Sequence, residues 1–279
     1  MIIIRQQQQH KLASSSSSSL SSSFSLRLSS SDSSIPSVNN SSSSTSSSSS
    51  FRNHLLLPIN SDLATNKDTN NGGQLQLLRN HFYALRHGQS LANVAGLIAS
   101  NPNIACTNYG LSDVGKKQAK EAETSDDDSS SQSQSPTGIV IVSSDLLRAK
   151  ETAQIVADTI HSITIDIRLR ERGFGDWDGG NDIHYNDVWK EDAIDPYHTK
   201  NNVESVWSVI DRATRCVIDW DKNDQKSGKN LGPGGYYWII CVAHGDVLQI
   251  LQTPFNKNID PSQHRSIQHL ETATLRSLL

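Results

Sequence analysis

Two histidines in this chain, His87 and His244, are each followed directly by a glycine, and Arg86 precedes the first of them. A neutral imidazole is a good nucleophile near pH 7, because its unperturbed pKa is about 6.5. One ring nitrogen must face the group under attack while the other donates a hydrogen bond to a carbonyl oxygen, which fixes the tautomer. Such a histidine is one part of what phosphoryl transfer through a histidine requires.

A phosphoryl group carries roughly two negative charges, which spread over its equatorial oxygens in the transition state. Arginine holds such oxygens with a planar, bidentate fork that lysine lacks. Arg86 and Arg148 are the candidates for this task. A protonated His244 would add positive charge and one more hydrogen-bond donor. Gly88 and Gly245 follow the two histidines, and we expect them to leave room for backbone to approach the phosphate.

The leaving oxygen of a phosphate ester needs a proton, so an acid is required close to the nucleophile. Glu171 suits this task if a partly dry site raises its pKa, and the same carboxylate could then activate water to hydrolyse the phosphohistidine. Its neighbours Arg170 and Arg172 leave an alternative open, in which Glu171 forms an ion pair at the surface.

Strands and helices alternate along the chain and would carry these residues to one place. Runs of β-branched and aromatic residues predict strands at His81–Arg86, Gly138–Ser143, Ile163–Ile167, Tyr236–Ala243 and Ala273–Leu278. Apolar residues at helical spacing predict helices at Ser112–Glu123, Asp145–Ile160, Val203–Trp220 and Asp246–Gln252. The alternation predicts an α/β fold, a three-layer α/β/α sandwich around a mainly parallel sheet. Ligands of such sheets bind at the carboxyl ends of the strands, so the candidate residues would share one crevice.

Local signals refine three of these elements. Ser112 and Ser144 stand where an N-cap is expected, because a serine hydroxyl accepts a hydrogen bond from the first turn of a helix. The run Gly138–Ser143 is β-branched almost throughout, which predicts a strand buried on both faces of the sheet.

Composition divides the chain into two parts. Residues 1–75 are dominated by serine, and the first 60 hold four basic residues against one acid, Asp32. This composition predicts disorder and is typical of an organelle transit peptide, which would be removed on import into a plastid or, as an alternative, a mitochondrion. If the segment is plain disordered chain, a cytoplasmic protein is the alternative. Residues 76–279 form the predicted catalytic domain, interrupted at 124–136 by a disordered acidic and serine-rich insertion.

Several classes of protein are disfavoured by the composition. The net charge of −4 and the scattered basic residues argue against a nucleic-acid binder. Cys106, Cys216 and Cys241 lie far apart without a CxxC pair, which argues against a disulfide framework or a structural zinc site. No apolar run approaches the roughly 20 residues that a membrane span needs. No cluster of carboxylates suggests a metal, so we expect neither metal nor cofactor, and the oligomeric state stays open.

Four sequence blocks resemble the histidine phosphatase superfamily, in its phosphoglycerate-mutase-like branch (branch 1). The blocks are Arg86-His87-Gly88-x-Ser90-x-x-Asn93, Ser144-Asp145-Leu146-x-Arg148-Ala149-x-x-Thr152-Ala153, Leu169-x-Glu171-Arg172-x-Phe174-Gly175-x-x-x-Gly179 and Val242-Ala243-His244-Gly245. They occur in family order, each at the end of a predicted strand, and the likeness spans about residues 81–279. The fold that the resemblance implies is the phosphoglycerate-mutase-like α/β sandwich.

The resemblance also implies a role for each matching position. His87 would be the nucleophile that becomes phosphorylated, and Glu171 would be the general acid and base. The phosphate-binding or substrate-binding positions would be Arg86, Asn93, Arg148, His244 and Gly245. The implied activity is that of a metal-independent phosphatase acting on a small phosphorylated metabolite, with a phosphopeptide left open as an alternative substrate.

Two other functions are weighed against the phosphatase. Phosphoglycerate mutases follow the last His-Gly with Asn and carry paired basic residues in a longer segment after the acid block. Here Asp246 follows, and residues 181–203 hold five acidic residues against two lysines, a composition poor for gripping a carboxylate or a second phosphate. A phosphatase is therefore favoured over a mutase. A non-catalytic phospho-ligand binding module is disfavoured because every expected catalytic group is present.

Four other histidines and the five tryptophans are not expected to take part in catalysis. We expect surface or loop positions for His184, His198, His264 and His269. The five tryptophans are expected in the core or in a pocket wall rather than in a platform that stacks on bases.

Overall fold

A computed structural model describes residues 78–122, 136–157, 162–222, 235–256 and 258–278. The predicted disordered N-terminus, residues 1–75, lies outside the described residues, as does the insertion predicted at 124–136 except for its last residue. Within the described part of the chain, none of the helices is long and apolar enough to cross a membrane.

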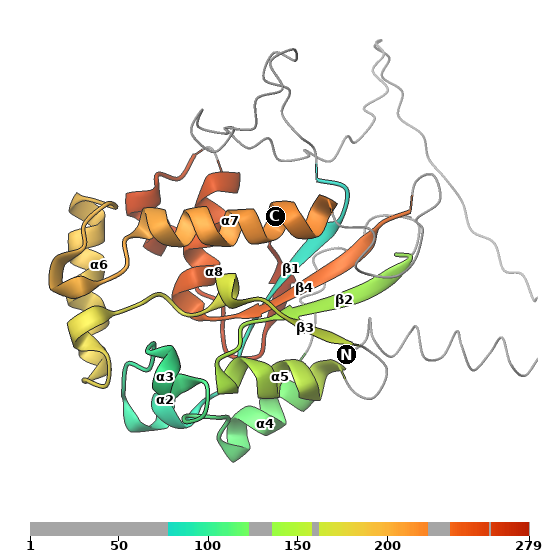
Figure 1. Cartoon of the computed structure of the whole chain (residues 1–279), viewed down its shortest axis with the longest axis horizontal. Coiled ribbons are helices and arrows are strands. Elements are labelled where there is room, and N and C mark those ends of the chain that lie inside the picture. The colour runs from blue at the N-terminus through green and yellow to red at the C-terminus, as the bar shows by residue number, and fades with distance from the viewer. Residues whose placement is uncertain (1–77, 123–135, 158–161, 223–234, 257, 279) are drawn as a thin grey trace, which may run out of the picture. The chain divides into compact units, whose positions relative to one another are not determined.

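The described strands form one five-stranded sheet (Figure 1). The strands are β1 (His81–Arg86), β2 (Gly138–Ser143), β3 (Ile163–Ile165), β4 (Tyr237–Ala243) and β5 (Leu275–Ser277). Their order across the sheet is β3-β2-β4-β1-β5, and only the edge strand β5 pairs antiparallel. The predicted α/β fold with a mainly parallel sheet is therefore confirmed.

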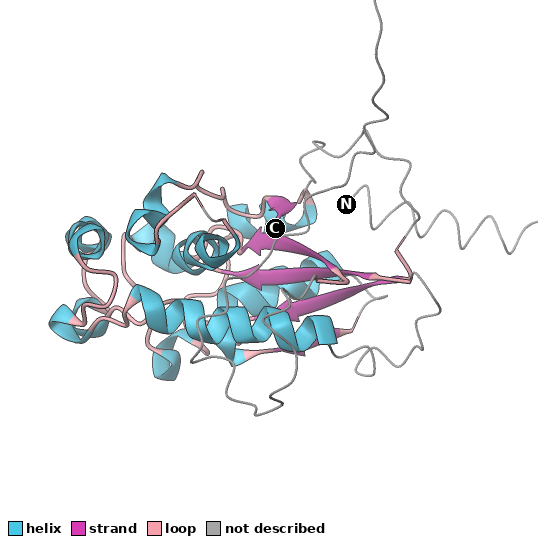
Figure 2. Cartoon of the chain, turned by 90° about the horizontal axis from the view of Figure 1, so that it is seen from above, coloured by secondary structure: helices cyan, strands magenta, loops and turns pink. Residues whose placement is uncertain are grey.

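Helices cover both faces of this sheet, whose strands lie side by side in the view of Figure 2. The α-helices are α2 (Leu91–Ala95), α3 (Pro102–Ala105), α4 (Asp113–Lys120), α5 (Leu147–Ala157), α6 (Tyr185–Ile194), α7 (Val206–Lys222) and α8 (Gly245–Gln252). Helices α7 and α8 lie on one side of the sheet, and α4 and α5 lie on the other (Figure 1). This arrangement confirms the three-layer sandwich.

The core lies between the sheet and helix α7. The helix buries Val206, Val209, Ile210, Ala213 and Val217, whose spacing of three and four residues places them on one helical face. Opposite them stand apolar residues of the central strands β1 and β4.

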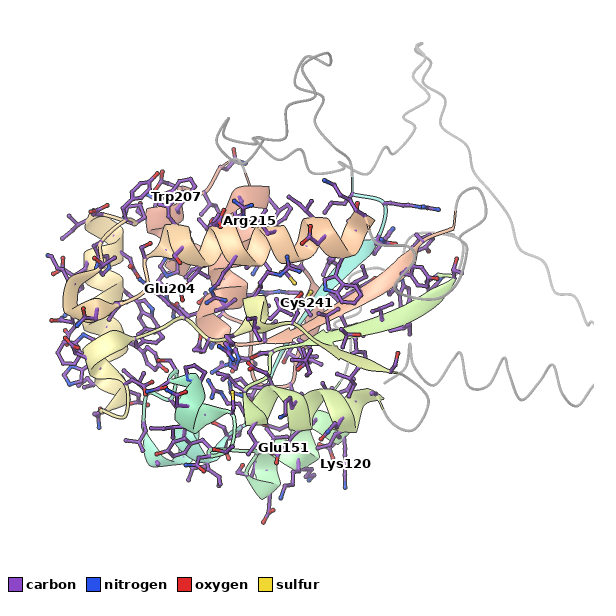
Figure 3. The ribbon with its side chains drawn as sticks, viewed as in Figure 1. Lys120, Glu151, Glu204, Trp207, Arg215 and Cys241 are labelled. Carbon is purple, nitrogen blue, oxygen red and sulfur yellow. The ribbon has the colours of Figure 1, made fainter. Side chains whose placement is uncertain are left out.

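The cysteines are free thiols, as the absence of a pairing motif predicted. Cys216 on α7 and Cys241 on β4 are buried, whereas Cys106 is half-buried. Cys241 is labelled in Figure 3.

Several element boundaries differ from the prediction for local reasons. The strand predicted at Ile163–Ile167 ends at Ile165, because the Asp166 side chain accepts a hydrogen bond from the backbone N–H of Arg168 and caps a short 3-10 helix, η1 (Ile167–Leu169). Helix α5 begins at Leu147 rather than Asp145, and its predicted end at Ile160 lies outside the described residues.

The structure also tests the two predicted N-cap serines and the predicted burial of strand β2. Ser112 is the N-cap of α4, as predicted, and accepts a bond from the N–H of Gly115 at 3.0 Å. Ser144 accepts a bond from the N–H of Leu146 at 3.2 Å, just before helix α5 begins. Strand β2 is fully buried only over its last three residues, so the prediction of burial along its whole length was wrong.

The sheet topology brings the candidate residues together. Strands β1, β2 and β4 run parallel, so the residues that follow Arg86, Ser143 and Ala243 emerge at the same edge of the sheet. His87 donates its backbone N–H to the carbonyl oxygen of Ala243 at 3.0 Å, which continues the ladder one residue beyond the strand. The crevice expected at these strand ends is therefore where the candidate residues meet.

Candidate active site

His87 lies at the end of β1 with its ring almost fully buried. Its Nδ1 is 2.7 Å from the carbonyl oxygen of Gly88, so Nδ1 carries the proton and donates it to that oxygen. The lone pair is therefore on Nε2, which accepts a hydrogen bond from Arg148 Nε at 3.0 Å. Burial, with the charge of Arg148, lowers the pKa of His87 well below its usual value and keeps the ring neutral. This is the tautomer that a nucleophilic histidine needs.

The loop that carries His87 is fixed from two sides. The N–H of Gly88 donates to Thr152 Oγ1 at 3.0 Å, and the Thr152 hydroxyl donates to the carbonyl oxygen of Arg148 at 2.8 Å. On the other side, a Cβ at Gly88 would lie 2.5 Å from the carbonyl oxygen of Gly115 in α4. The glycine therefore allows helix α4 to approach the loop, and the expectation that it makes room for phosphate was wrong.

Gly245 fits the original expectation better. A Cβ there would lie 3.3 Å from Arg86 Nε and 3.3 Å from the His269 ring, so a side chain would crowd the guanidinium of Arg86. Gly245 also begins helix α8 and lines the pocket beside His87.

His244 faces the nucleophile, with the two imidazole ring centroids 5.1 Å apart. Its Nε2 is 3.0 Å from Ser144 Oγ. The Ser144 hydroxyl can donate its hydrogen to Nε2, an arrangement that would place the proton of His244 on Nδ1. Burial, together with the charge of Arg148, lowers the pKa of His244 well below its usual value. The lowered pKa favours a neutral ring over the expected protonated His244, and with its proton on Nδ1 this ring would offer one N–H donor.

Three buried donors around His87 have no hydrogen-bond partner among the described residues: Arg86 Nε, Arg148 Nη1 and His244 Nδ1. Arg86 itself is held from its far side, where Nη1 lies 2.5 Å from His269 Nε2 and donates to the carbonyl oxygen of Leu270 at 3.1 Å. An unsatisfied buried donor costs about 1–3 kcal/mol, and more when the group is charged. Three of them gathered beside one nucleophile make a cradle for an anion.

Glu171 enters the same pocket from the segment that follows η1. Its Oε1 accepts the backbone N–H of Arg172 at 3.0 Å. Burial raises the pKa of Glu171 to about 7; the positive charge of Arg148 opposes this rise, and the carboxylate of Asp246 adds to it. A carboxyl group with such a pKa can give and take a proton near neutral pH.

The neighbouring arginines do not pair with the Glu171 carboxylate. Arg170 donates from Nε and Nη2 to the two carboxylate oxygens of Asp145, at 2.8 and 2.5 Å. Arg172 turns its guanidinium into the protein, toward Asp192. The surface ion pair considered for Glu171 is therefore absent among the described residues.

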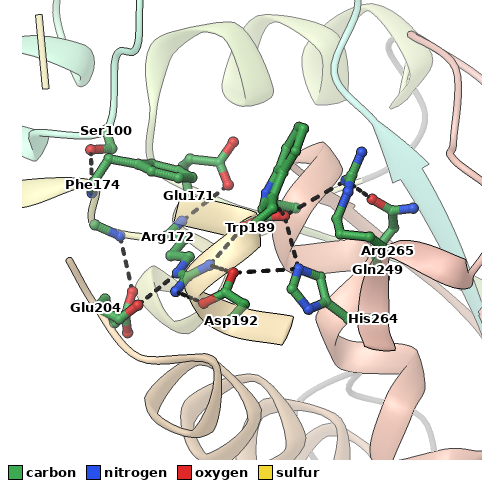
Figure 4. A network of polar contacts seen from close by, with 12 residues as sticks. Ser100, Glu171, Arg172, Phe174, Trp189, Asp192, Glu204, Gln249, His264 and Arg265 are labelled. Carbon is green, nitrogen blue, oxygen red and sulfur yellow. Dashed lines mark hydrogen bonds and ion pairs between the residues drawn. The ribbon is translucent and has the colours of Figure 1, made fainter. Parts of the chain in front are cut away.

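A buried charge network anchors helix α6 behind the pocket (Figure 4). Arg172 donates to both oxygens of Asp192, at 2.7 and 2.8 Å, and its Nε donates to the carbonyl oxygen of Glu204 at 2.6 Å. His198 lies 2.7 Å from Asp192, and His264 Nε2 lies 3.5 Å from Asp246. Both histidines are buried. His198 lies in the loop after helix α6, within the expected surface or loop positions, whereas His264 lies inside a 3-10 helix, so the expectation was wrong for His264. Within the acidic segment, the negative charge of Asp192 is thus already neutralised by the buried guanidinium of Arg172.

The pocket in front of these residues has a volume of about 320 Å³. Of the predicted residues, Arg86, His87, Asn93, Arg148, Glu171 and Gly245 line it, whereas His244 does not. It is also lined by Ser90, Ala92, Leu97, Ala99, Asp182, Tyr185, Trp189, Asp246, Arg265 and His269. Sequence reasoning missed Tyr185, Arg265 and His269, because no fixed spacing ties them to the four blocks. Trp189 does form a pocket wall, as one of the two expected places for tryptophans.

Asn93 also lines the pocket, but its carbonyl oxygen has a structural task. Asn93 Oδ1 accepts the backbone N–H of Ser90 at 3.0 Å and the Ser90 hydroxyl at 2.8 Å, which completes the capping box of helix α2. The amide nitrogen of Asn93 is the group that remains for a ligand. Among the described residues, no group of three histidine, cysteine, aspartate or glutamate side chains is arranged to hold a metal ion.

The sequence of this chain is similar to those of known phosphatases. The family model for the histidine phosphatase superfamily, branch 1, matches residues 82–279. A glucosyl-3-phosphoglycerate phosphatase of Mycolicibacterium vanbaalenii is 30% identical over 175 residues, which cover 60% of this chain and 70% of that protein.

Solved structures share the fold. A mycobacterial hydrolase is 22% identical with a TM-score of 0.54, and the match covers 70% of this chain and 87% of that one. A mycobacterial glucosyl-3-phosphoglycerate phosphatase is 24% identical with a TM-score of 0.53, over 70% and 89% of the two chains.

Proposed function

The chain belongs to the histidine phosphatase superfamily, branch 1, and is a phosphatase, and we propose that it works through a phosphohistidine on His87. The observation that carries this proposal is the cradle of unpartnered buried donors beside His87: Arg86 Nε, Arg148 Nη1 and His244 Nδ1. A phosphate monoester brings the oxygens that would satisfy them, next to an imidazole whose reactive lone pair is on Nε2.

In the first step, His87 Nε2 attacks the phosphorus atom. The bond from Arg148 Nε to Nε2 breaks, and the guanidinium turns its donors to the phosphoryl oxygens. The bond between phosphorus and the ester oxygen breaks, and Glu171 in its protonated form gives a proton to that oxygen. The pKa of Glu171, raised by burial to about 7, keeps a large share of this acid protonated near neutral pH.

In the second step, water attacks the phosphohistidine. Glu171, now ionised, accepts the proton of the water, and the electron pair of the bond between phosphorus and nitrogen returns to Nε2. The Gly88 carbonyl oxygen keeps the ring in one orientation through both steps, because it holds the proton on Nδ1. Arg86 and Arg148 balance the charge that spreads over the equatorial oxygens.

The proposed substrate is a small phosphorylated metabolite. The pocket volume of about 320 Å³ is at the lower end of the range typical of small-molecule sites. The named activity of the relative, a glucosyl-3-phosphoglycerate phosphatase, supports a substrate of this class. A phosphopeptide stays an alternative, as do a mutase and a non-catalytic binding module.

The test is a screen of phosphorylated metabolites and a generic aryl phosphate against the full chain and its His87→Ala variant. Wild type is expected to release inorganic phosphate, and the variant is expected to lose the activity because no other group accepts the phosphoryl group. A variant that keeps more than about a hundredth of the wild-type rate would contradict the mechanism, since loss of the nucleophile costs several orders of magnitude. Incubation with 3-phosphoglycerate and a bisphosphoglycerate primer separates a mutase, which would form an isomer rather than release phosphate.

A further inference from the structure

The segment that carries Glu171 has no regular secondary structure to hold it. Residues 170–174 lie between η1 and the 3-10 helix η2 (Gly175–Trp177) and belong to neither a helix nor a strand. Their buried backbone N–H and carbonyl groups must therefore be paired with side chains or with loops. The groups that pair with them determine where the carboxyl group of Glu171 lies in the pocket.

One side chain of helix α7 pairs with three carbonyl oxygens of this region. Arg212 Nη1 donates to the carbonyl oxygen of Arg168 at 2.6 Å and to that of Arg170 at 2.9 Å. Its Nη2 donates to the carbonyl oxygen of Glu171 itself, over a longer distance of 3.4 Å. Arg212 thus holds the backbone at Glu171 and on its N-terminal side.

Glu204 holds the backbone on the C-terminal side of Glu171. Its Oε2 accepts the backbone N–H of Gly173 at 3.0 Å, and its own backbone N–H donates to the carbonyl oxygen of Gly173 at 2.8 Å. Its carbonyl oxygen accepts a hydrogen bond from Arg172 Nε at 2.6 Å (Figure 4). The two residues therefore hold the segment from both ends.

Arg212 and Glu204 also bind each other. Arg212 donates from Nε to Glu204 Oε1 at 2.8 Å and from Nη2 to Oε2 at 3.0 Å, which is a bidentate pair. Together with the bonds to the carbonyl oxygens, this pair engages every N–H of the guanidinium. Burial would raise the pKa of Glu204, but the hydrogen bond from Arg212 outweighs burial, so this pKa lies below its usual value. The carboxylate therefore stays ionised near neutral pH and keeps its hold on the arginine.

The carboxyl group of Glu171 follows its own backbone, because its Oε1 accepts the backbone N–H of Arg172. A shift of the segment would therefore move the carboxyl group within the pocket. Neither Arg212 nor Glu204 is among the residues that line the pocket. Any effect of Arg212 on the reaction must therefore be indirect.

We propose that Arg212 is a positioning residue for the general acid, which fixes the backbone at Glu171 so that the carboxyl group reaches the ester oxygen. The inference rests on the proposed function, in which Glu171 gives its proton to that oxygen. A general acid must lie within hydrogen-bond reach of the atom that it protonates. A displacement of about 1 Å can lower the rate by about 100-fold.

The experiment compares two leaving groups, because loss of the acid affects them differently. An alkoxide needs a proton in order to leave, whereas nitrophenolate is a stable anion and leaves without one. We measure kcat/KM for phosphate release from 3-phosphoglycerate and from 4-nitrophenyl phosphate, in the wild type and in Arg212→Lys. The fastest alkyl phosphate of the metabolite screen replaces 3-phosphoglycerate if the wild type does not hydrolyse it. The ratio kcat/KM covers the steps up to release of the leaving group, so hydrolysis of the phosphohistidine does not enter.

Arg212→Lys keeps the positive charge that faces Glu204 but loses the planar fork. Its kcat/KM for the alkyl phosphate should fall by about 10- to 100-fold, whereas the value for nitrophenyl phosphate should change little. Glu171→Gln should show the same dependence on the leaving group. Adding Arg212→Lys to Glu171→Gln should cause no further loss, because both changes act through one carboxyl group.

Two other variants complete the comparison. Arg215→Lys on α7 is the matched control, since this side chain is exposed and pairs with Asp211 (Figure 3). It should leave both kcat/KM values unchanged. Glu204→Gln keeps the shape of its side chain but removes the charge that holds Arg212, and it carries the test, with a smaller selective loss, if Arg212→Lys does not fold.

Equal losses for both substrates in folded Arg212→Lys would overturn the proposal, because they indicate a role in stability alone. An unchanged value for the alkyl phosphate would overturn it as well. If Glu171→Gln shows the dependence on the leaving group and Arg212→Lys does not, only the positioning role is refuted. If Glu171→Gln lacks that dependence, or if the wild type hydrolyses neither substrate, the proposed function is refuted, and the positioning role with it.

Discussion

Replacing Glu171 with glutamine is expected to stabilise the protein at alkaline pH while it removes most of the catalytic activity. Burial raises the pKa of Glu171 from 4.5 to about 7 in the folded protein, and Arg148 opposes this only in part. Below pH 4.5 the carboxyl group is protonated in both the folded and the unfolded state, so it costs nothing. As the pH rises from 4.5 toward 7, the unfolded chain releases the proton that the folded state retains, and stability is lost.

The magnitude follows from the size of this pKa difference. Each pKa unit corresponds to about 1.4 kcal/mol, which sets an upper limit of about 3 kcal/mol. Because the side chain of Glu171 is partly open to the pocket, we discount this to about 2 kcal/mol. Glutamine resembles the neutral acid and has no proton to lose. For a domain of this size, the melting temperature of Glu171→Gln should exceed that of the wild type by about 4–8 °C at pH 8.5.

The assay is thermal unfolding of both proteins, followed by circular dichroism at pH 4.5 and pH 8.5. The gain should be small at pH 4.5, and the exposed control Glu121→Gln should show no comparable gain at pH 8.5. Turnover of an alkyl phosphate by Glu171→Gln should fall by about 10²- to 10⁴-fold, the usual contribution of general acid–base catalysis. Equal melting-temperature changes at both pH values, or a loss of stability at pH 8.5, would refute the claim that Glu171 is buried with a raised pKa.

Three further changes test other parts of the site. Activity should survive prolonged treatment with a chelator, and a loss that zinc or magnesium restores would indicate another mechanism. Asp192→Asn should destabilise the protein by about 3 kcal/mol in chemical denaturation, because Arg172 would keep its buried charge and lose its main partner; Asp187→Asn, an exposed control, should leave the transition midpoint nearly unchanged. Gly115→Ala should lower kcat strongly even where the protein folds, because the added methyl group would overlap the Gln89 carbonyl oxygen and displace the loop that carries His87; an unaltered kcat would contradict this packing.

The positions of the principal site residues could be predicted because their signals are local. His87, Glu171 and His244 each follow an apolar segment or a short motif, and parallel strands bring such positions to one edge. The tautomer of His87 agrees with the requirement stated from chemistry alone, that one ring nitrogen donates to a carbonyl oxygen. The roles assigned to these residues remain predictions until the variants are measured.

The buried network could not be predicted, because its pairs are distant in sequence and their residue types usually lie at the surface. Arg172 contacts Asp192 and Asp246 only because helices α6 and α8 pack against it. No sequence spacing predicts such an ion pair. The same holds for Arg265, whose guanidinium lies over the ring of Trp189 on α6. His198 and His264 looked ordinary for this reason.

Strand and helix ends were displaced where a side chain competes with the backbone. Strand β3 ends before Asp166 because the carboxylate of Asp166 caps the following 3-10 helix. The alternation of apolar residues used to predict the strand does not show such a cap. Residues 1–75 lie outside the described residues, so removal on import into a plastid stays a prediction. Mass spectrometry of the mature N-terminus decides it, and an intact Met1 would contradict it.

The most direct test of the central claim is the site at which the protein is phosphorylated during turnover. Wild type mixed briefly with substrate and quenched in alkali should carry one phosphoryl group on His87, stable in base and lost in acid. The account expects the unpartnered nitrogens Arg86 Nε and Arg148 Nη1 to bind the phosphoryl oxygens of this adduct. An acid-stable adduct, or a phosphoryl group on another residue of a catalytically active sample, would contradict the account.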